Sequence, residues 1–264
     1  SCLSWNAYIK PQLISSDYEG IVALWDAAVG TSIRSFDEHD KRAWSVDFST
    51  VEPMQLASGG DDTKVKIWAT NMKNSVATIE SRANVCSVRF NPEKAKEIAF
   101  GSADHHVHYY DLRKTSTPVH EFSGHRKAVS YVRFLNGDSL VTASTDCTLR
   151  EWSISESLSS GTSQCRRSFE GHTNEKNFVG LSVSGDGEFI ACGSETNEMF
   201  VYYSCLSRPL ITHPFGNSLD SVSGEELPDE DPGQFVSSVC WMHHTPNVII
   251  TANSQGRIKV MEMV

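Results

Sequence analysis

An internal repeat is the feature that most constrains how this 264-residue chain can fold. Four short segments end alike, in an apolar run that carries an aromatic residue: 21–26, 65–69, 107–111 and 149–153. Their aromatic residues are Trp25, Trp68, Tyr110 and Trp152, which are 43, 42 and 42 residues apart. A unit this short cannot bury its hydrophobic face alone, so consecutive copies must pack against one another. The sequence therefore predicts a chain of stacked, similar units.

Each unit has the pattern of a small antiparallel sheet. Runs with period-two alternation, such as 44–48 and 129–134, come before each aromatic segment, and short polar turns such as 57–62 and 142–146 lie between them. A period of about 40–45 residues is typical of a four-stranded WD-repeat blade. Two degenerate copies follow at 199–202 and 258–261. We therefore predict an all-β fold, a WD40-type β-propeller, with blades over 1–42, 43–82, 83–127, 128–175, 176–234 and 235–264.

The ends of the chain and two long insertions complete this prediction. The chain begins on the first strand of a blade and ends after the third strand of another. Propellers commonly close by pairing the two ends, so we expect an incomplete ring, six visible four-stranded blades of seven, with a closed six-bladed ring as the alternative. Residues 155–165 and the acidic segment 216–234 are predicted to be mobile surface loops. The acidic loop could bind a basic partner, although a solvated insertion is the simpler interpretation.

The polar residues that recur in each repeat can be explained by a structural role, without catalysis. In WD repeats a His, a turn Asp, a strand Ser or Thr and the Trp indole form one hydrogen-bonded network, and buried polar groups are tolerated only when they are satisfied. Two sets have the required spacing: His39 with Asp62 and Trp68, and His125 with Asp146 and Trp152. We therefore interpret these histidines and aspartates as structural and not catalytic.

Composition and motif searches point away from enzymes, nucleic acid and membranes. The net charge is −10, which disfavours binding to phosphate backbones, and no apolar stretch approaches the length of a membrane span. Seven dispersed cysteines without a CxxC pair favour a reducing compartment, either cytosol or nucleus. Phosphate-loop, zinc-protease and serine-hydrolase motifs are missing, so we expect no catalytic residues and no cofactor. His105, His106 and His108 lack further ligands with suitable spacing, so no metal site is expected.

Six longer segments of the sequence resemble a known family more specifically than the repeat pattern does. The segments are 16–20, 38–45, 101–106, 124–131, 171–178 (Gly-His-Thr-Asn-Glu-Lys-Asn-Phe) and 193–198. Through nearly the whole chain the sequence resembles the C-terminal propeller of the constitutive-photomorphogenesis ubiquitin ligase and of its partners, the suppressor-of-phytochrome-A proteins. The resemblance implies a non-catalytic substrate receptor, nuclear and cytoplasmic, in a cullin-linked ubiquitin ligase complex. Glu175 and Ala43 look ligase-like, whereas the Ser-rich fourth repeat and the ending 258–264 look suppressor-like, so the branch stays open.

The resemblance also implies a binding site for peptides of transcription regulators or photoreceptors that bear a Val-Pro pair between acidic flanks. The matching positions are Tyr18, Arg42, Trp44, His105, Lys127, Glu175 and Phe178. The residue types fit these roles, because aromatic walls suit a rigid Val-Pro pair and the two cations suit acidic flanks. Two alternatives remain: Trp44 and Phe178 could merely fill the space between blades, and the chain could be a structural scaffold without a linear-peptide pocket.

Overall fold

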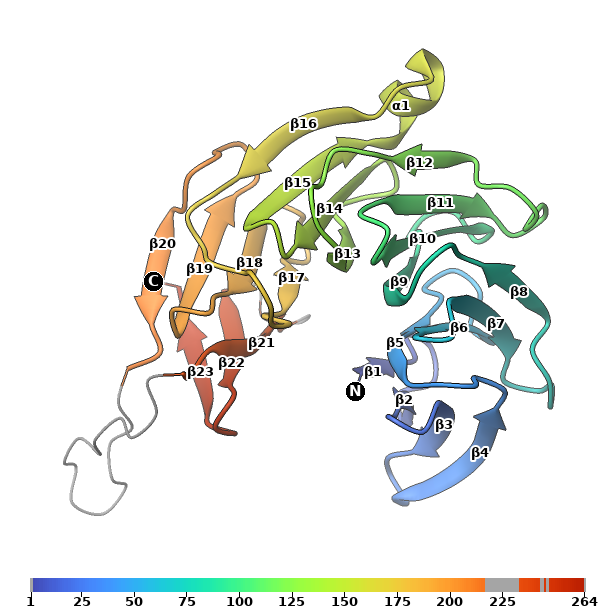
Figure 1. Cartoon of the computed structure of the whole chain (residues 1–264). Helices are drawn as coiled ribbons and strands as arrows, with labels where there is room; N and C mark the ends of the chain where they lie inside the picture. Colours follow the sequence, from blue (N-terminus) through green and yellow to red (C-terminus); the bar gives the residue numbers. More distant parts are fainter. Residues whose placement is uncertain (1, 217–232, 243–244, 246, 264) are drawn as a thin grey trace. The chain divides into compact units, whose positions relative to one another are not determined.

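The computed structural model describes residues 2–216, 233–242, 245 and 247–263 (Figure 1). The chain divides into two compact units, residues 1–144 with 150–167 and residues 145–149 with 168–264. Twenty-three β-strands and one α-helix make up the regular structure of the described residues. The strands form six antiparallel sheets, each built from strands that follow one another in the chain. This confirms the prediction of an all-β chain made of propeller blades.

Each sheet is formed by neighbouring strands in sequence order. The first three sheets contain β1 (Cys2–Trp5), β2 (Gln12–Ser16), β3 (Ile21–Asp26) and β4 (Thr31–Asp37); β5 (Ala43–Phe48), β6 (Gln55–Gly60), β7 (Lys64–Ala69) and β8 (Ala77–Glu80); and β9 (Val85–Phe90), β10 (Glu97–Ser102), β11 (Val107–Asp111) and β12 (His120–Phe122). The last three contain β13 (Val129–Phe134), β14 (Ser139–Ser144), β15 (Thr148–Ser153) and β16 (Gln164–Phe169); β17 (Leu181–Val183), β18 (Phe189–Gly193), β19 (Glu198–Tyr203) and β20 (Ile211–Pro214); and β21 (Val236–Trp241), β22 (Val248–Asn253) and β23 (Ile258–Glu262).

The repeated aromatic residue holds the same register in successive sheets. Trp68 on β7 lies opposite Leu56 on β6, and Trp25 and Tyr110 occupy the matching places opposite the second strands of their own sheets. The period of the sequence is therefore the period of the sheets. Five sheets have four strands, as predicted, and the sixth has three among the described residues.

Hydrophobic side chains from adjacent sheets form the core. One cluster joins Val22 and Phe36 of the first sheet to Val46 and Trp68 of the second. The rings of Phe36 and Trp68 lie 4.9 Å apart, centroid to centroid, and both side chains are almost fully buried. Burying a large apolar side chain contributes about 1.5–3 kcal/mol, so such inter-sheet pairs stabilise the stack more than any single surface contact.

Polar side chains link the first strands of successive sheets, which lie side by side without forming a β-ladder. Ser45 Oγ accepts a hydrogen bond from the backbone N–H of Val88 (3.1 Å), and Ser87 Oγ accepts one from Val132 (3.2 Å). In the second unit, Ser182 Oγ accepts from the N–H of Trp241 (3.0 Å). These bonds satisfy buried backbone donors that would otherwise be costly.

The prediction of a mobile loop at residues 155–165 is wrong. Residues Ile154–Ser160 form helix α1, and Gln164 and Cys165 already belong to β16. Ser153 caps the helix, because its side chain accepts a hydrogen bond from the N–H of Glu156, and Gly161 ends it in the left-handed conformation at φ 69°. Burial of Ile154 holds the helix against the sheet. The sequence Ser-Ile-Ser-Glu is a capping-box pattern that could have predicted this helix. The second predicted loop, 216–234, lies mostly outside the described residues.

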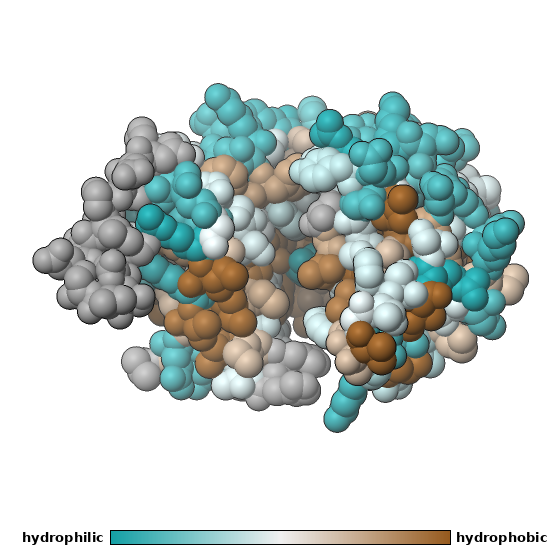
Figure 2. All heavy atoms as spheres, turned by 90° about the horizontal axis from the view of Figure 1, so that it is seen from below, coloured by the Kyte–Doolittle hydropathy of each residue, from teal (hydrophilic) through white to brown (hydrophobic). Residues whose placement is uncertain are grey.

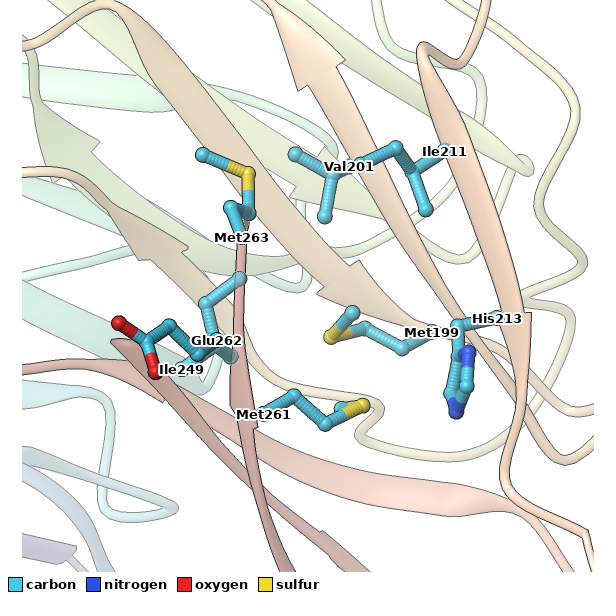
Figure 3. A pocket seen from close by; sticks show the side chains of 8 residues that line it. All are labelled: Met199, Val201, Ile211, His213, Ile249, Met261, Glu262 and Met263. Atoms are coloured by element: carbon cyan, nitrogen blue, oxygen red, sulfur yellow. The ribbon is translucent and has the colours of Figure 1, made fainter. Parts of the chain in front are cut away.

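A pocket in the second unit lies beside a position where the repeat departs from its pattern. β23 carries Met261 opposite Ile249, the place where β7 carries Trp68 opposite Leu56. Beside Met261 is a pocket of about 360 Å³ with thioether and aliphatic walls and one imidazole at its rim (Figure 3). Its lining residues are Met199, Val201, Ile211, His213, Ile249, Met261, Glu262 and Met263. A thin, flexible methionine fills less space at this position than an indole would.

Apolar side chains also reach the surface of the molecule, as the brown patches in Figure 2 show. On β23, Ile258 and Val260 are 68% and 67% exposed. In the described part of the chain no strand pairs with the outer edge of β23. The one helix found among these residues is too short to cross a membrane.

Candidate peptide-binding surface

The turn between the second and third strands has a residue with a positive φ in all six sheets. These residues are Gly20, Thr63, His105, Cys147, Asn197 and Gly256. Non-glycine residues adopt this region at a cost, so its recurrence marks a turn that the surrounding sheet enforces. Tyr18 and His105 belong to two of these turns.

The connections between sheets touch these turns. The N–H of Ala43, where β5 begins, donates to the carbonyl of Asp17 in the first sheet (3.1 Å). The N–H of Asp61 in the next turn donates to the carbonyl of Arg42 (2.9 Å). Because strands alternate in direction, the turns and the inter-sheet connections lie at the same end of each sheet. The first unit therefore presents Tyr18, Arg42 and Trp44 at one end.

Tyr18, Arg42 and Trp44 form one exposed cluster, hereafter the aromatic cluster. The Tyr18 and Trp44 rings meet edge to face, with centroids 5.6 Å apart and an interplanar angle of 74°. The Arg42 guanidinium carbon lies 5.3 Å from the centre of the Tyr18 ring. Tyr18 remains 59% exposed, and Arg42 is also exposed, so the cluster faces solvent although Trp44 is half-buried. Such a surface can contact an apolar side chain and an acidic group together.

Two residues that sequence reasoning missed hold Trp44 in place. Asp61 Oδ1 accepts a hydrogen bond from Trp44 Nε1 (2.7 Å) and another from Asn84 Nδ2 (2.8 Å). Gly60 lets the turn approach closely, because a Cβ at this position would collide with the backbone carbonyl oxygen of Arg42. The indole is therefore fixed by a carboxylate shared with the third sheet. The sequence feature that could have revealed both residues is the Gly-Gly-Asp-Asp turn at 59–62. Its second Asp binds His39, and its first Asp binds the neighbouring indole.

The connection that carries Arg42 is anchored by the network around His39. His39 Nδ1 lies 2.8 Å from Asp62 Oδ2, and its Nε2 lies 2.7 Å from Ser58 Oγ. Trp68 Nε1 donates to the same Ser58 Oγ (2.8 Å), which fits a hydroxyl that donates in turn to His39 Nε2. Burial raises the pKa of Asp62, but the hydrogen bonds that its carboxylate accepts from His39 and from the N–H groups of Lys64 and Asp40 outweigh this effect, so the pKa lies below its ordinary value.

A related network anchors the connection that carries Lys127. His125 Nε2 lies 2.8 Å from Thr142 Oγ1, and Trp152 Nε1 donates to the same oxygen (2.9 Å). Asp146 accepts from the N–H of Thr148 (3.0 Å) and from its hydroxyl (2.6 Å). The histidine and tryptophan thus meet on a strand hydroxyl in both sheets.

His105 and Lys127 lie in exposed loops of the third and fourth sheets. His105 occupies the positive-φ position of its turn, at φ 74°, and its side chain is exposed. Lys127 is also exposed, and its backbone carbonyl accepts from Ser144 Oγ (3.1 Å). Both residues lie at the same end of their sheets as the aromatic cluster does in its own. No direct contact joins either side chain to that cluster among the contacts described.

Glu175 and Phe178 lie in the second unit, on the connection that leads into β17. Glu175 is exposed and Phe178 is half-buried. Glu195, in the turn after β18, accepts from the N–H groups of Lys176 (2.8 Å) and Asn177 (2.7 Å). Burial raises the pKa of Glu195, yet these backbone bonds lower it below its usual range. Glu195 is therefore a positioning residue for this connection, a role the sequence did not reveal.

Comparison with known proteins agrees with this architecture. The chain is 55% identical over 261 residues to E3 ubiquitin-protein ligase COP1 of Pisum sativum, across 99% of this chain. It is 50% identical over 266 residues to Protein SUPPRESSOR OF PHYA-105 1 of Arabidopsis thaliana, and 36% identical over 276 residues to WD repeat-containing protein RUP2 of the same plant. The chain covers 70% of RUP2. It belongs to the WD-repeat β-propeller family of COP1 and the SPA proteins.

The chain matches only part of the length of these longer relatives. The chain spans 37% of the pea COP1 protein and 25% of SUPPRESSOR OF PHYA-105 1. Residues 11–206 also match the β-propeller family described as Nucleolar protein 10-like, N-terminal domain. The membership therefore confirms the resemblance drawn from the repeats and the motif at 171–178, and it concerns the WD-repeat part of these proteins.

The histidine cluster of this propeller is organised by Asp104. Its carboxylate Oδ2 lies 2.9 Å from His108 Nε2, and its Oδ1 accepts from the N–H of His106 (3.1 Å). His106 Nδ1 lies 2.7 Å from the Asp104 carbonyl. Within the described ranges no group of three or more His, Cys, Asp and Glu could hold a metal ion.

Asp104→Asn is expected to lower stability at pH 7 by about 1–3 kcal/mol, because a charge-assisted bond to His108 is lost. Burial raises the pKa of Asp104, but His108 and backbone donors lower it to about 2, against an ordinary value of 3.8. The carboxylate therefore contributes fully above its unfolded pKa, and its contribution is lost as the pH falls towards 2. Urea denaturation between pH 7 and pH 2.5 should show the difference from wild type shrinking below about pH 4.

The matched control is Asp40→Asn, which removes an exposed carboxylate paired with Lys64 at 3.1 Å. An exposed pair contributes about 0–1 kcal/mol, so this variant should differ little from wild type at any pH. A difference for Asp104→Asn that stays constant down to pH 2.5 would contradict the role given to its carboxylate.

Proposed function

We propose that this chain is a non-catalytic substrate receptor of a ubiquitin ligase complex, which docks acidic peptides that bear a Val-Pro pair. The observation that carries the proposal is the solvent-facing aromatic cluster of Tyr18, Arg42 and Trp44. One relative is named an E3 ubiquitin-protein ligase, which supports the same class of complex for this chain. Its partners would be transcription regulators or photoreceptors and a cullin-linked adaptor, in the nucleus and cytoplasm.

The chemistry of the cluster suits such a peptide. A Val-Pro pair is stiff, so docking it against aromatic walls costs little conformational entropy. The Arg42 guanidinium extends over the Tyr18 ring, which favours a carboxylate beside the apolar pair. On a chain with a net charge of −10, this local positive charge distinguishes the cluster from its surroundings.

Two further predicted residues of the first unit are proposed to extend this surface. His105 and Lys127 contribute from exposed loops at the same end of their sheets, and Lys127 adds a second cation for the flanks. For the second unit, taken by itself, Glu175 and Phe178 are proposed to contact peptide, and Glu195 holds the connection that carries them.

Peptide titration tests the proposal. A fluorescent peptide with a Val-Pro pair and acidic flanks should bind with micromolar affinity, and a peptide with Ala-Ala in place of Val-Pro should bind at least ten-fold more weakly. Raising the salt from 50 to 500 mM should weaken binding, because the exposed charges are screened. Equal binding of the two peptides would favour the scaffold alternative, in which the propeller mediates assembly without a linear-peptide pocket.

A further inference from the structure

A row of charged side chains lies on the first strands of the second, third and fourth sheets, away from the aromatic cluster. β5, β9 and β13 each carry one in the same register, immediately before a phenylalanine: Asp47, Arg89 and Arg133. β9 packs against both β5 and β13, so the three positions are neighbours (Figure 1). The proposed peptide site uses none of them.

Asp47 is already fully engaged by its neighbours. Its Oδ1 accepts from Arg89 Nη1 at 2.6 Å and lies 3.5 Å from Ser4 Oγ, while its Oδ2 accepts from the N–H of Phe90 at 2.9 Å. The Asp47 and Arg89 side chains are only 15% and 14% exposed. The Asp47 carboxylate thus neutralises the Arg89 guanidinium at a site where both side chains are largely buried.

The second guanidinium has no such partner. Arg133 donates from Nη1 to the carbonyl of Val132 (3.0 Å), and no carboxylate lies within ion-pair distance of it in the described part of the chain. Arg89 Nε is also buried without a hydrogen-bond partner there. Burial and the charge of Arg89 lower the pKa of Arg133 to about 10, so it still carries its charge at pH 7.

Two guanidinium groups against one carboxylate leave this row with an excess positive charge. Removing a charge from water without a partner is costly, and the cost is offset when a counter-ion enters. Guanidinium groups are flat and present several N–H donors, a geometry that matches the oxygens of carboxylates and phosphates. A hydrated chloride ion does not present a comparable set of acceptor atoms, fixed in position, to these N–H donors.

We propose that Arg89 and Arg133 form an oxyanion-binding site on β9 and β13, which takes a phosphate or carboxylate group. Arg133 provides the charge and Arg89 Nε provides the second donor. The oxyanion completes the row that Asp47 only half neutralises, and it joins the third sheet to the fourth. This site is independent of the proposed peptide docking, since it shares no residue with the aromatic cluster.

Thermal unfolding of the whole chain tests the site, with inorganic phosphate and glutarate as separate probes at constant ionic strength set by sodium chloride. A bound oxyanion should raise the Tm by about 3–6 °C at saturation, and the raised Tm should follow a binding curve. A larger response to phosphate would identify a free phosphate group as the ligand, and a larger response to glutarate would identify a carboxylate. No response beyond that of sodium chloride would overturn the proposal.

Arg133→Met should abolish the probe-dependent rise. Without a probe it should unfold at the same temperature as wild type or higher, because it removes a charge that lacks a partner. The control is Arg113→Met, whose guanidinium is 74% exposed and paired with Asp111, and which should keep the full response. If Arg133→Met destabilises the fold, Arg133→Lys gives a second test: the charge remains but the fork is lost, so the binding curve should shift at least three-fold to higher probe concentration. A curve unchanged in either variant would refute the assignment.

Discussion

Trp44→Ala is expected to weaken binding of the Val-Pro peptide by about thirty-fold or more, because buried aromatic anchors at interface centres typically contribute 2 kcal/mol or more. Trp44 forms the wall against which the Tyr18 ring packs, with centroids 5.6 Å apart. Removing the indole deletes apolar contact area and also frees Tyr18 and Arg42 from their fixed geometry. The dissociation constant should be measured by fluorescence polarisation at low salt, with thermal unfolding in parallel.

Matched variants separate binding from folding. Trp44→Phe keeps an aromatic wall but cannot donate to Asp61, so an intermediate loss is expected. Tyr8→Ala removes an aromatic side chain that is 55% exposed on the β1–β2 connection, at the other end of the first sheet from the Tyr18 turn. This variant should bind the peptide as wild type does. If Trp44→Ala bound the peptide normally, Trp44 would be only a packing residue between sheets.

The repeat period predicted the sheets because both have the same cause. Trp68, Tyr110 and Trp152 on their third strands each pack in a core cluster with the preceding sheet, and this demand recurs once per four strands. The aromatic positions 25, 68 and 110 accordingly share one register in the structure. Helix α1 was missed because its serines suggested a loop, although Ser153 and Glu156 form a local cap that composition cannot reveal.

The binding residues were predicted less directly than the fold. Spacing alone places Tyr18 in a turn, but it does not show that Arg42 lies over its ring or that Trp44 meets its edge. Those contacts depend on how closely the connection between the first and second sheets approaches the Gly60–Asp61 turn. The missing side chain of Gly60 and the backbone bond from Asp61 to Arg42 set this distance. Glu195 could not be predicted for a similar reason, because its partners are backbone N–H groups, which carry no sequence signature.

Trp68→Ala is expected to destabilise the chain by about 3–5 kcal/mol, among the largest effects of any single substitution. The indole is fully buried, packs against Phe36 and donates to Ser58 Oγ at 2.8 Å. Its loss leaves a cavity and loosens the Ser58–His39–Asp62 chain that anchors the connection to Arg42, so peptide binding should weaken as well. Urea denaturation measures the first effect and polarisation the second.

The graded variants identify the source of that loss. Trp68→Phe retains most of the apolar volume but not the N–H donor, so it should cost less than Trp68→Ala while still weakening the His39 network. Trp25→Ala provides the matched comparison, because Trp25 donates to Ser15 Oγ at 2.8 Å but is only half-buried. A loss for Trp25→Ala as large as that for Trp68→Ala would show that burial and the histidine network do not set the difference. If instead Trp68→Phe impairs peptide binding while most stability remains, the network transmits its effect through the position of Arg42, and the structural histidine serves the binding surface as well as the fold.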